Sequence, residues 1–184
     1  MTRPTRNWLL LSVFMIAVFA ISPRLPDAVS WSLSALGVLL VALSLWVASP
    51  FLRARSLLAR RDFDAAATEL AAFETSLVGS AWKRALGSLA VGFHTSNPLA
   101  AARNTLGAVR LEQGRLDDAR THFQTALERD PRYGVPFGNL AVLAAMKGDA
   151  AGAEEARAKA AALGFKPKLL AQVIAHKLAQ APTR

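Results

Sequence analysis

Two long apolar runs occupy residues 8–22 and 28–49, and a short polar segment with two prolines separates them. The second run has 22 residues. As a helix it would rise by roughly 33 Å, which matches a bilayer hydrocarbon core of about 30 Å. Trp31 and Trp46 lie near its two ends, where indole side chains favour the headgroup boundary. The pattern therefore predicts a transmembrane helix over 28–49.

The first run is shorter, and two interpretations remain open for it. It can be a retained membrane helix over about residues 7–22, which would form a hairpin with the helix at 28–49. It can also be a cleaved signal peptide, because Arg3 and Arg6 form a basic N-terminal region and Val18-Phe19-Ala20 fits a cleavage site. The second apolar run begins only a few residues later, which favours the hairpin.

Basic residues lie outside the two apolar runs. Arg3 and Arg6 precede the first run, and the segment between the runs has Arg24 offset by Asp27. Four arginines follow the second run: Arg53, Arg55, Arg60 and Arg61. Because cytoplasmic flanks carry the excess of basic residues, both termini are expected in the cytoplasm of a bacterium, with a multi-pass anchor in its inner membrane.

Small residues recur on one stripe of the second predicted membrane helix, at Ser30, Ser34, Gly37, Ser44 and Ala48. Small side chains let helix backbones approach closely in lipid. Two interpretations fit this stripe: packing against the first helix of the same chain, or a homodimer face. The run has no ionisable residue, so it offers no proton relay or ion path.

The C-terminal two thirds contain an internal repeat, because residues 100–133 align with residues 134–167 at an offset of 34. The positions that carry the pattern are Leu106, Gly107, Gly114, Ala119, Phe123, Ala126 and Pro131 in the first unit, and Leu140, Ala141, Gly148 and Ala153 in the second. With this period and pattern the segment resembles the tetratricopeptide repeat family, whose unit is a helix–turn–helix. In such a unit Gly107 stands at a close helix contact, and Gly114 ends the first helix with a positive φ.

The remaining segments are predicted to extend the repeats. Residues 51–78 form a degenerate unit, with Arg61 where glycine is preferred, and residues 168–184 form a capping helix. Residues 79–97 contain an amphipathic helix with Trp82, Leu86, Leu89 and Phe93 on one stripe. This inserted helix is either a packing helix between units or an interfacial helix on the membrane, since Lys83 and Arg84 flank the stripe.

Composition and candidate chemistry narrow the function. Of the 184 residues 53% are hydrophobic, the net charge is +9, and no cysteine is present, which excludes disulfides and thiolate metal sites. His94, His122 and His176 have no metal-ligand spacing, and Asp118 with His122 fits a surface pair. We expect no catalytic site, cofactor or metal. The basic charges are spread and mixed with acidic ones, so we expect no nucleic-acid partner.

The resulting prediction is an all-α protein: two transmembrane helices, a short tetratricopeptide-like α-solenoid and a C-terminal cap. The resemblance implies a partner-binding groove lined by first helices, at Asn104, Ala108, Leu111 and Glu112 and at Gly138, Asn139 and Val142. We expect an adaptor that recruits a protein or peptide to the bilayer. The alternative is a structural component of an oligomeric membrane complex, assembled through the small-residue stripe and repeat stacking.

Overall fold

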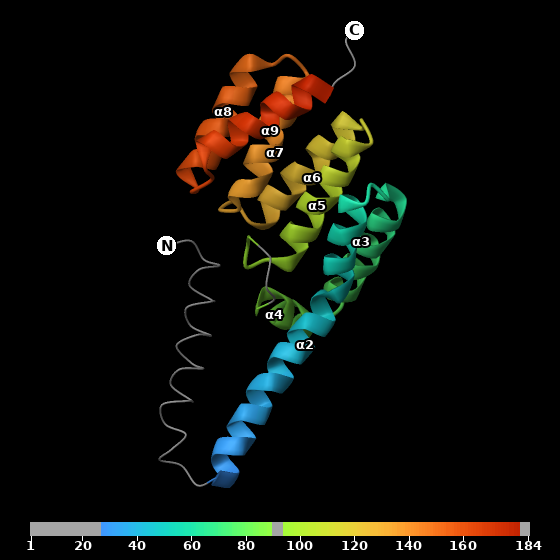
Figure 1. The fold of residues 1–184 in the computed structure, drawn as a ribbon, viewed down its shortest axis with the longest axis vertical. Coiled ribbons are helices and arrows are strands. Elements are labelled where there is room, and N and C mark those ends of the chain that lie inside the picture. The colour runs from blue at the N-terminus through green and yellow to red at the C-terminus, as the bar shows by residue number, and fades with distance from the viewer. Residues whose placement is uncertain (1–26, 90–93, 181–184) are drawn as a thin grey trace.

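The structure is a computed structural model that describes residues 27–89 and 94–180, and within these ranges it contains eight helices and no strand (Figure 1). The all-helical class is therefore confirmed for the described part of the chain. The predicted first membrane helix, over about 7–22, lies outside the described residues. The helices are α2 (Asp27–Ala59), α3 (Phe63–Val78), α4 (Ala81–Leu89), α5 (Pro98–Glu112), α6 (Leu116–Arg129), α7 (Gly134–Met146), α8 (Ala150–Ala162) and α9 (Pro167–Gln180).

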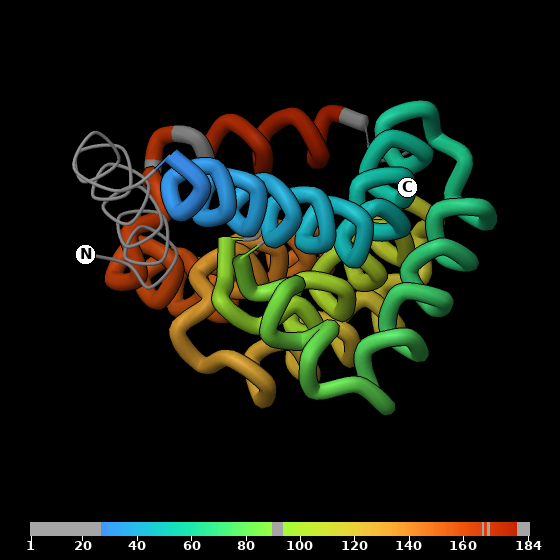
Figure 2. Tube along the Cα trace, turned by 90° about the horizontal axis from the view of Figure 1, so that it is seen from below, coloured from blue at the N-terminus to red at the C-terminus, as the bar shows by residue number. Residues whose placement is uncertain are grey.

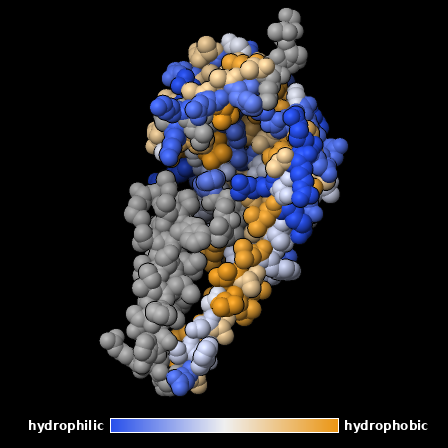
Figure 3. Space-filling view, viewed as in Figure 1, coloured by the Kyte–Doolittle hydropathy of each residue, from blue (hydrophilic) through white to orange (hydrophobic). Residues whose placement is uncertain are grey.

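Helix α2 is a single helix of 33 residues that includes the whole of the second apolar run. It is the one helix among the described residues that is long and apolar enough to cross a membrane. Its lower part projects away from the other labelled helices in Figure 1, and its surface there is largely hydrophobic in Figure 3. The exposed large apolar side chains of α2 are Val29, Trp31, Leu36, Val38, Leu39, Leu40, Val41, Leu45, Trp46 and Leu52.

Pro50 lies inside α2 without ending it. Because proline has no N–H, the carbonyl of Trp46 loses its usual helical donor four residues later. The hydroxyl of Ser49 donates a hydrogen bond to this carbonyl at 2.9 Å and so replaces the missing donor. The helix therefore continues from the apolar run into residues 51–59, which pack with the rest of the chain. We call the described part from residue 51 to residue 180 the helical array.

The helices of the array pair as hairpins, α2 with α3, α5 with α6 and α7 with α8. Gly114 and Gly148, one period apart, have φ of +75° and +76°, the left-handed conformation that the sequence predicts for the end of the first helix. Arg61 adopts the same conformation in the first hairpin, with φ of +63°, although it is not a glycine. Asp62 and Asp149 follow two of these turns and accept the N–H of the residue three positions later.

Small residues allow the helices of each hairpin to approach closely. A Cβ atom added to Gly107 would lie 2.5 Å from the ring of Phe123, which is fully buried. Gly107 is therefore a close contact between α5 and α6, as its place in the repeat predicts. The other small repeat positions of the array that are buried are Ala119, Ala126, Ala141 and Ala153.

Two apolar clusters form the core of the array. One joins the end of α2 to α3 and α5, with Phe51, Leu70 and Phe73 buried at its centre. The other joins α6, α7 and α8 to α9 around Phe123, Leu143 and other side chains. Leu106 is buried in the first cluster, Leu140 is half-buried against the second, and Pro131 is exposed. The end of the apolar α2 helix is thus part of the folded array.

Helices α4 and α9 pack beside the hairpins, α4 against α2 and α9 against α7, and Figure 2 shows the array from below with α2 in front. The hydroxyl of Ser44 on α2 donates a hydrogen bond to the carbonyl of Leu86 on α4 at 2.9 Å. Ser44, predicted to face another membrane helix, is therefore engaged with α4. Along the rest of the stripe, Gly37 is buried, Ser30 is half-buried and Ser34 is exposed.

Candidate functional site: the shared face of α5, α7 and α9

The predicted groove residues come from two helices, and the structure brings them together. Helix α5 provides Asn104, Ala108, Leu111 and Glu112, and helix α7 provides Gly138, Asn139 and Val142. The side-chain amide of Asn139 donates a hydrogen bond to Oδ1 of Asn104 at 2.9 Å. This bond joins the equivalent faces of two successive first helices. We call these seven residues the shared face.

The shared face is largely covered. Four of its residues are buried, namely Asn104, Leu111, Gly138 and Val142, while Ala108, Glu112 and Asn139 are half-buried. A Cβ atom added to Gly138 would meet the side chains of Phe165 and Leu170 at 3.6 and 3.7 Å. Lys177 of α9 forms an ion pair with Glu112, 65 positions earlier in the chain. The C-terminal helix therefore covers part of the predicted groove.

Helix α9 buries fewer of its apolar side chains than its sequence suggests. Leu170 is buried at 3% exposure and Ile174 is half-buried against the same cluster. Val173 and Leu178 follow Leu170 and Ile174 at helical spacings of three and four residues, yet both are exposed. Helix α9 therefore covers α7 with one edge and leaves apolar side chains on its outer side.

A buried polar cluster lies at the centre of the shared face. Tyr133, just before α7, is buried and shares a hydrogen bond with the Asn104 side chain. Burial raises the pKa of the Tyr133 hydroxyl well above its ordinary value, so the group stays protonated and neutral at physiological pH. Arg55 of α2 acts on the same hydroxyl and lowers its pKa in part. The cluster links α5 to α7 through neutral hydrogen bonds.

We expect Asn104→Ala to lower the free energy of unfolding of the array by about 1–2 kcal/mol, because it removes hydrogen bonds to the buried Tyr133 hydroxyl and the half-buried Asn139 amide. The measurement is chemical unfolding of the full chain in detergent, followed by circular dichroism. Asn139→Ala should destabilise less, because Asn139 is only half-buried. The double variant should lose less than the sum of the single losses, and additive losses would contradict a direct bond between the two side chains.

An ion cluster connects α5 to α3 and α6. The carboxylate of Glu74, whose side chain is only 13% exposed, receives Arg103 at 2.8 Å and Arg129 at 3.5 Å. Arg103 thus joins α5 to α3 of the preceding hairpin through an ion pair with Glu74.

His122 lies next to this cluster. Its Nδ1 atom is 3.5 Å from the Arg103 guanidinium. Burial, and then the positive charges of Arg103 and Arg110, hold the pKa of His122 below its ordinary value. Asp118, expected to pair with His122, instead forms an ion pair with Arg115 at 2.5 Å. These surroundings favour a neutral imidazole with a structural role.

The lowered pKa of His122 predicts a pH dependence of stability. The unfolded chain takes up a proton on this imidazole near the ordinary pKa of 6.5, whereas the folded chain does so only at lower pH. The free energy of unfolding should therefore fall as the pH decreases from about 7.5 to 5.5. His122→Gln should reduce this fall, measured by chemical unfolding at both pH values, whereas the control His94→Gln, at an exposed position, should not. An unchanged pH dependence in His122→Gln would contradict this account.

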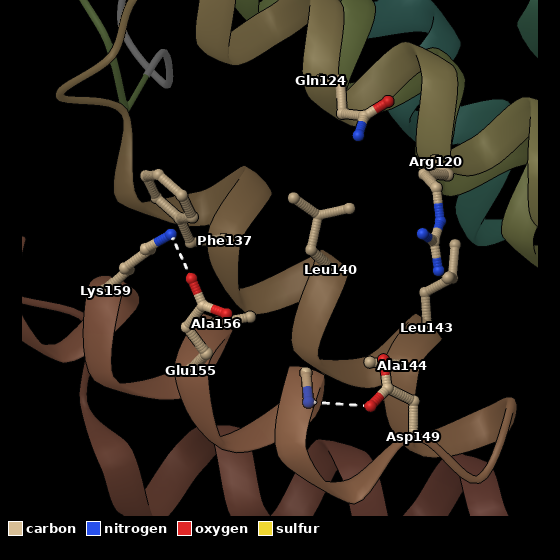
Figure 4. Close-up of a pocket in the computed structure, with 11 residues that line it drawn as sticks. Arg120, Gln124, Phe137, Leu140, Leu143, Ala144, Asp149, Glu155, Ala156 and Lys159 are labelled. Atoms are coloured by element: carbon tan, nitrogen blue, oxygen red, sulfur yellow. Dashed lines mark hydrogen bonds and ion pairs between the residues drawn. The ribbon is translucent and has the colours of Figure 1, made fainter.

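A pocket of about 190 Å³ lies on α6, α7 and α8 and contains none of the predicted groove residues. Figure 4 shows Phe137 and Leu140 of α7 facing the space between α6 and α8. Lys159 at its rim is paired with Glu155 at 2.6 Å, and Asp149 caps α8. The pocket was not predicted from the sequence. Its signal is a pair of polar residues four positions apart on each second helix, Arg120 and Gln124 on α6 and Glu155 and Lys159 on α8.

The described residues contain no group of three His, Cys, Asp or Glu side chains that could hold a metal ion. In the same part of the chain, every buried polar side-chain atom has a hydrogen-bond partner. The shared face and the pocket are thus surfaces built from packing and paired polar groups.

No model of a known protein family matches the sequence, and no curated protein matches it. The resemblance to tetratricopeptide repeats therefore rests on the residues of the chain itself and stays a prediction.

Proposed function

We propose that the chain is a membrane-anchored adaptor with a tetratricopeptide-like array, which holds a protein partner at the cytoplasmic face of a bacterial inner membrane. The observation that carries this proposal is the continuity of α2. One helix contains the apolar run and then enters the core of the array, with Phe51 and Ala54 buried. The rings of Phe51 and Phe73 are 5.7 Å apart and tie this end of α2 to α3.

A continuous helix has a direct consequence for an adaptor. Because α2 is not followed by a flexible linker, the array is held in a fixed orientation relative to the apolar run. A partner bound to the array is then confined near the membrane, which raises its effective concentration for reactions there. Exposure of the apolar side chains along the projecting part of α2 to water is unfavourable. Insertion of this part among lipid acyl chains removes that exposure.

The surface that we propose for the partner is the accessible part of the shared face. The part of the shared face that α9 leaves accessible includes Ala108 and Asn139, both half-buried. Solenoids of paired helices bind extended partners along the face formed by their first helices. We assign the partner to this accessible part, next to Glu112 and its ion pair with Lys177.

The test is site-specific photo-crosslinking of the full chain in native membranes. A photoreactive amino acid is placed at Ala108 on the shared face, or at Ala151 as a control on exposed α8. We expect a crosslinked protein of another sequence from position 108 and a much weaker one from position 151. Equal crosslinking from both positions, or none from position 108, would overturn the assignment.

Crosslinking of position 108 to a second copy of the chain would support the alternative of a structural oligomer. The structure bears on this alternative through Ser44, whose hydroxyl is bonded to α4 of the same chain. Ala48, one turn further along, is fully buried. This end of the small-residue stripe is therefore used within one chain, which favours the adaptor over assembly through the whole stripe.

A further inference from the structure

Large apolar side chains are exposed on α4 and on the two helices that α4 contacts, α2 and α3. Leu45 and Trp46 on α2, Val78 at the end of α3, and Trp82 and Leu89 on α4 are all exposed. Trp82 and Leu89 are seven residues apart and lie on one side of α4. We call these five residues the α4 patch. Trp46 is 60% exposed and Trp82 is 53% exposed, which is unusual for the largest apolar side chain.

The inner side of α4 is already occupied. Leu86 is half-buried against the core of the array, and its carbonyl accepts the Ser44 hydrogen bond. A Cβ atom added to Gly87 would lie 3.3 Å from Pro98 and 3.8 Å from Val47. Helix α4 is thus fixed against α2 and α5, and its outer side holds Trp82 and Leu89. The fixed position means that the α4 patch cannot turn inward.

The α4 patch lies at the level where the apolar run of α2 leaves the hydrocarbon. Twenty helical residues rise by about 30 Å, so a core that begins at Asp27 ends near Trp46. Ser44 and Val47, the contacts of α4, flank this level. Figure 1 shows α4 beside the middle of α2, on the side of the array that faces the projecting part. Tryptophan is enriched at this depth because its ring is apolar and its N–H is polar.

One cation, the ammonium group of Lys83, lies close to both tryptophan rings of the α4 patch. The Nζ atom of Lys83 is 5.6 Å from the centre of the Trp82 ring and 5.9 Å from that of Trp46. No carboxylate pairs with Lys83 in the part of the chain that the structure describes. Arg84 has a different role, because its guanidinium donates to the carbonyls of Leu77 and Val78 at the end of α3.

We propose that α4 is an interfacial helix whose outer side lies in the headgroup layer of the membrane, where Lys83 binds the phosphate of an anionic phospholipid between Trp46 and Trp82. The inference rests on the proposed membrane anchoring by α2 and adds a specific contact to it. The inference is based on the continuity of the exposed apolar surface and on the positive charge of Lys83. The α4 patch continues the exposed apolar surface of α2, and it has a cation but no acidic residue on α4.

The first test measures the depth of α4 in the membrane. The full chain has no cysteine, so single substitutions can carry a spin label in nanodiscs. Labels go on Ala85→Cys in α4, on Leu40→Cys in α2 and on Ala151→Cys in α8, all at exposed positions. We expect position 40 to be accessible to oxygen in the acyl chains, position 85 to be at headgroup depth, and position 151 to be accessible to an aqueous relaxation agent.

The three labels separate the inference from the anchoring on which it rests. If position 40 is in lipid but position 85 is as aqueous as position 151, the interfacial assignment of α4 is wrong while the anchor stands. If position 40 is itself aqueous, the anchor fails and the inference fails with it.

The second test measures the lipid headgroup. Native mass spectrometry of the full chain in detergent compares phosphatidylglycerol with zwitterionic phosphatidylcholine. We expect tighter binding of phosphatidylglycerol, and a loss of about fivefold in Lys83→Gln. The matched control Lys168→Gln, an exposed lysine at the far end of the array, should bind as the unchanged chain does. Equal binding of the two lipids, or equal losses in both variants, would overturn the phosphate site.

Discussion

Replacing Gly107 with valine should lower the free energy of unfolding of the helical array by about 3 kcal/mol. The first added atom would lie 2.5 Å from the Phe123 ring, far inside van der Waals contact. Phe123 is fully buried, so its ring has no open space into which it can move. The two helices must therefore separate or the ring must leave its position. The measurement is chemical unfolding of the full chain in detergent, followed by circular dichroism.

Gly79→Val is the matched control for this substitution. Gly79 ends α3 with φ of −81°, and a Cβ atom added there meets nothing within 4 Å. The control should change the free energy of unfolding by no more than about 0.5 kcal/mol. Equal losses at positions 79 and 107 would show that the substitution acts through the backbone, and that the contact of α5 with α6 is not as close as the structure shows.

A charge in the first half of α2 should prevent its insertion into a membrane, whereas the same charge in the second half should not. Leu40 and Leu52 are 40% and 38% exposed and lie on the same helix. Leu40→Arg places a guanidinium within the hydrocarbon, at a cost of about 3 kcal/mol, whereas Leu52→Arg places it beyond Trp46 in water. The measurement is microsomal insertion of the segment Asp27–Ala59 between two glycosylation sites.

The pair of leucines controls for residue type and exposure. The expected result is a large drop in insertion for Leu40→Arg and almost none for Leu52→Arg. A similar effect at both positions would indicate that the boundary does not fall near Trp46. No effect at either position would indicate that α2 is not a membrane span at all.

Local patterns in the sequence were sufficient for the features that depend on neighbouring residues. The 22-residue apolar run predicts a long helix, and the structure has one from Asp27 to Ala59. Gly114 and Gly148 take the left-handed conformation because a glycine adopts it without a steric clash. Gly107 lies at a close helix contact, as its place in the repeat predicts, and the structure shows that the ring it meets is that of Phe123. Each of these features can be predicted from a helical period together with one residue of distinctive size or backbone freedom.

The features that the sequence did not predict depend on how distant segments meet. Ser44 looks like part of a membrane packing stripe, but its hydroxyl bonds to a carbonyl 42 positions later. Leu170 and Val173 have the same apolar character, yet only Leu170 is buried, because the packing of α9 against α7 decides which of its side chains are covered. The ion pair of Arg103 with Glu74 likewise requires the docking of α5 on α3. No local sequence pattern predicts these contacts between distant segments.

The predicted groove has one feature that the sequence predicts and one that it does not. The residues predicted for the groove on α5 and α7 do lie together, since Asn139 donates a hydrogen bond to Asn104. It did not reveal that Lys177 of α9 reaches Glu112 and covers part of this face. Ala108 is therefore a better probe of partner binding than either asparagine, because the asparagines also hold the two helices together.

The central claim is that α2 crosses the inner membrane and holds the array on the cytoplasmic side. Its most direct test is cysteine accessibility in intact cells, with Ala28→Cys at the start of α2 and Ala151→Cys on α8, two exposed positions in a chain without cysteine. A membrane-impermeant maleimide should label position 28 in intact cells and position 151 only after the cells are permeabilised. Labelling of position 151 in intact cells would contradict the claim.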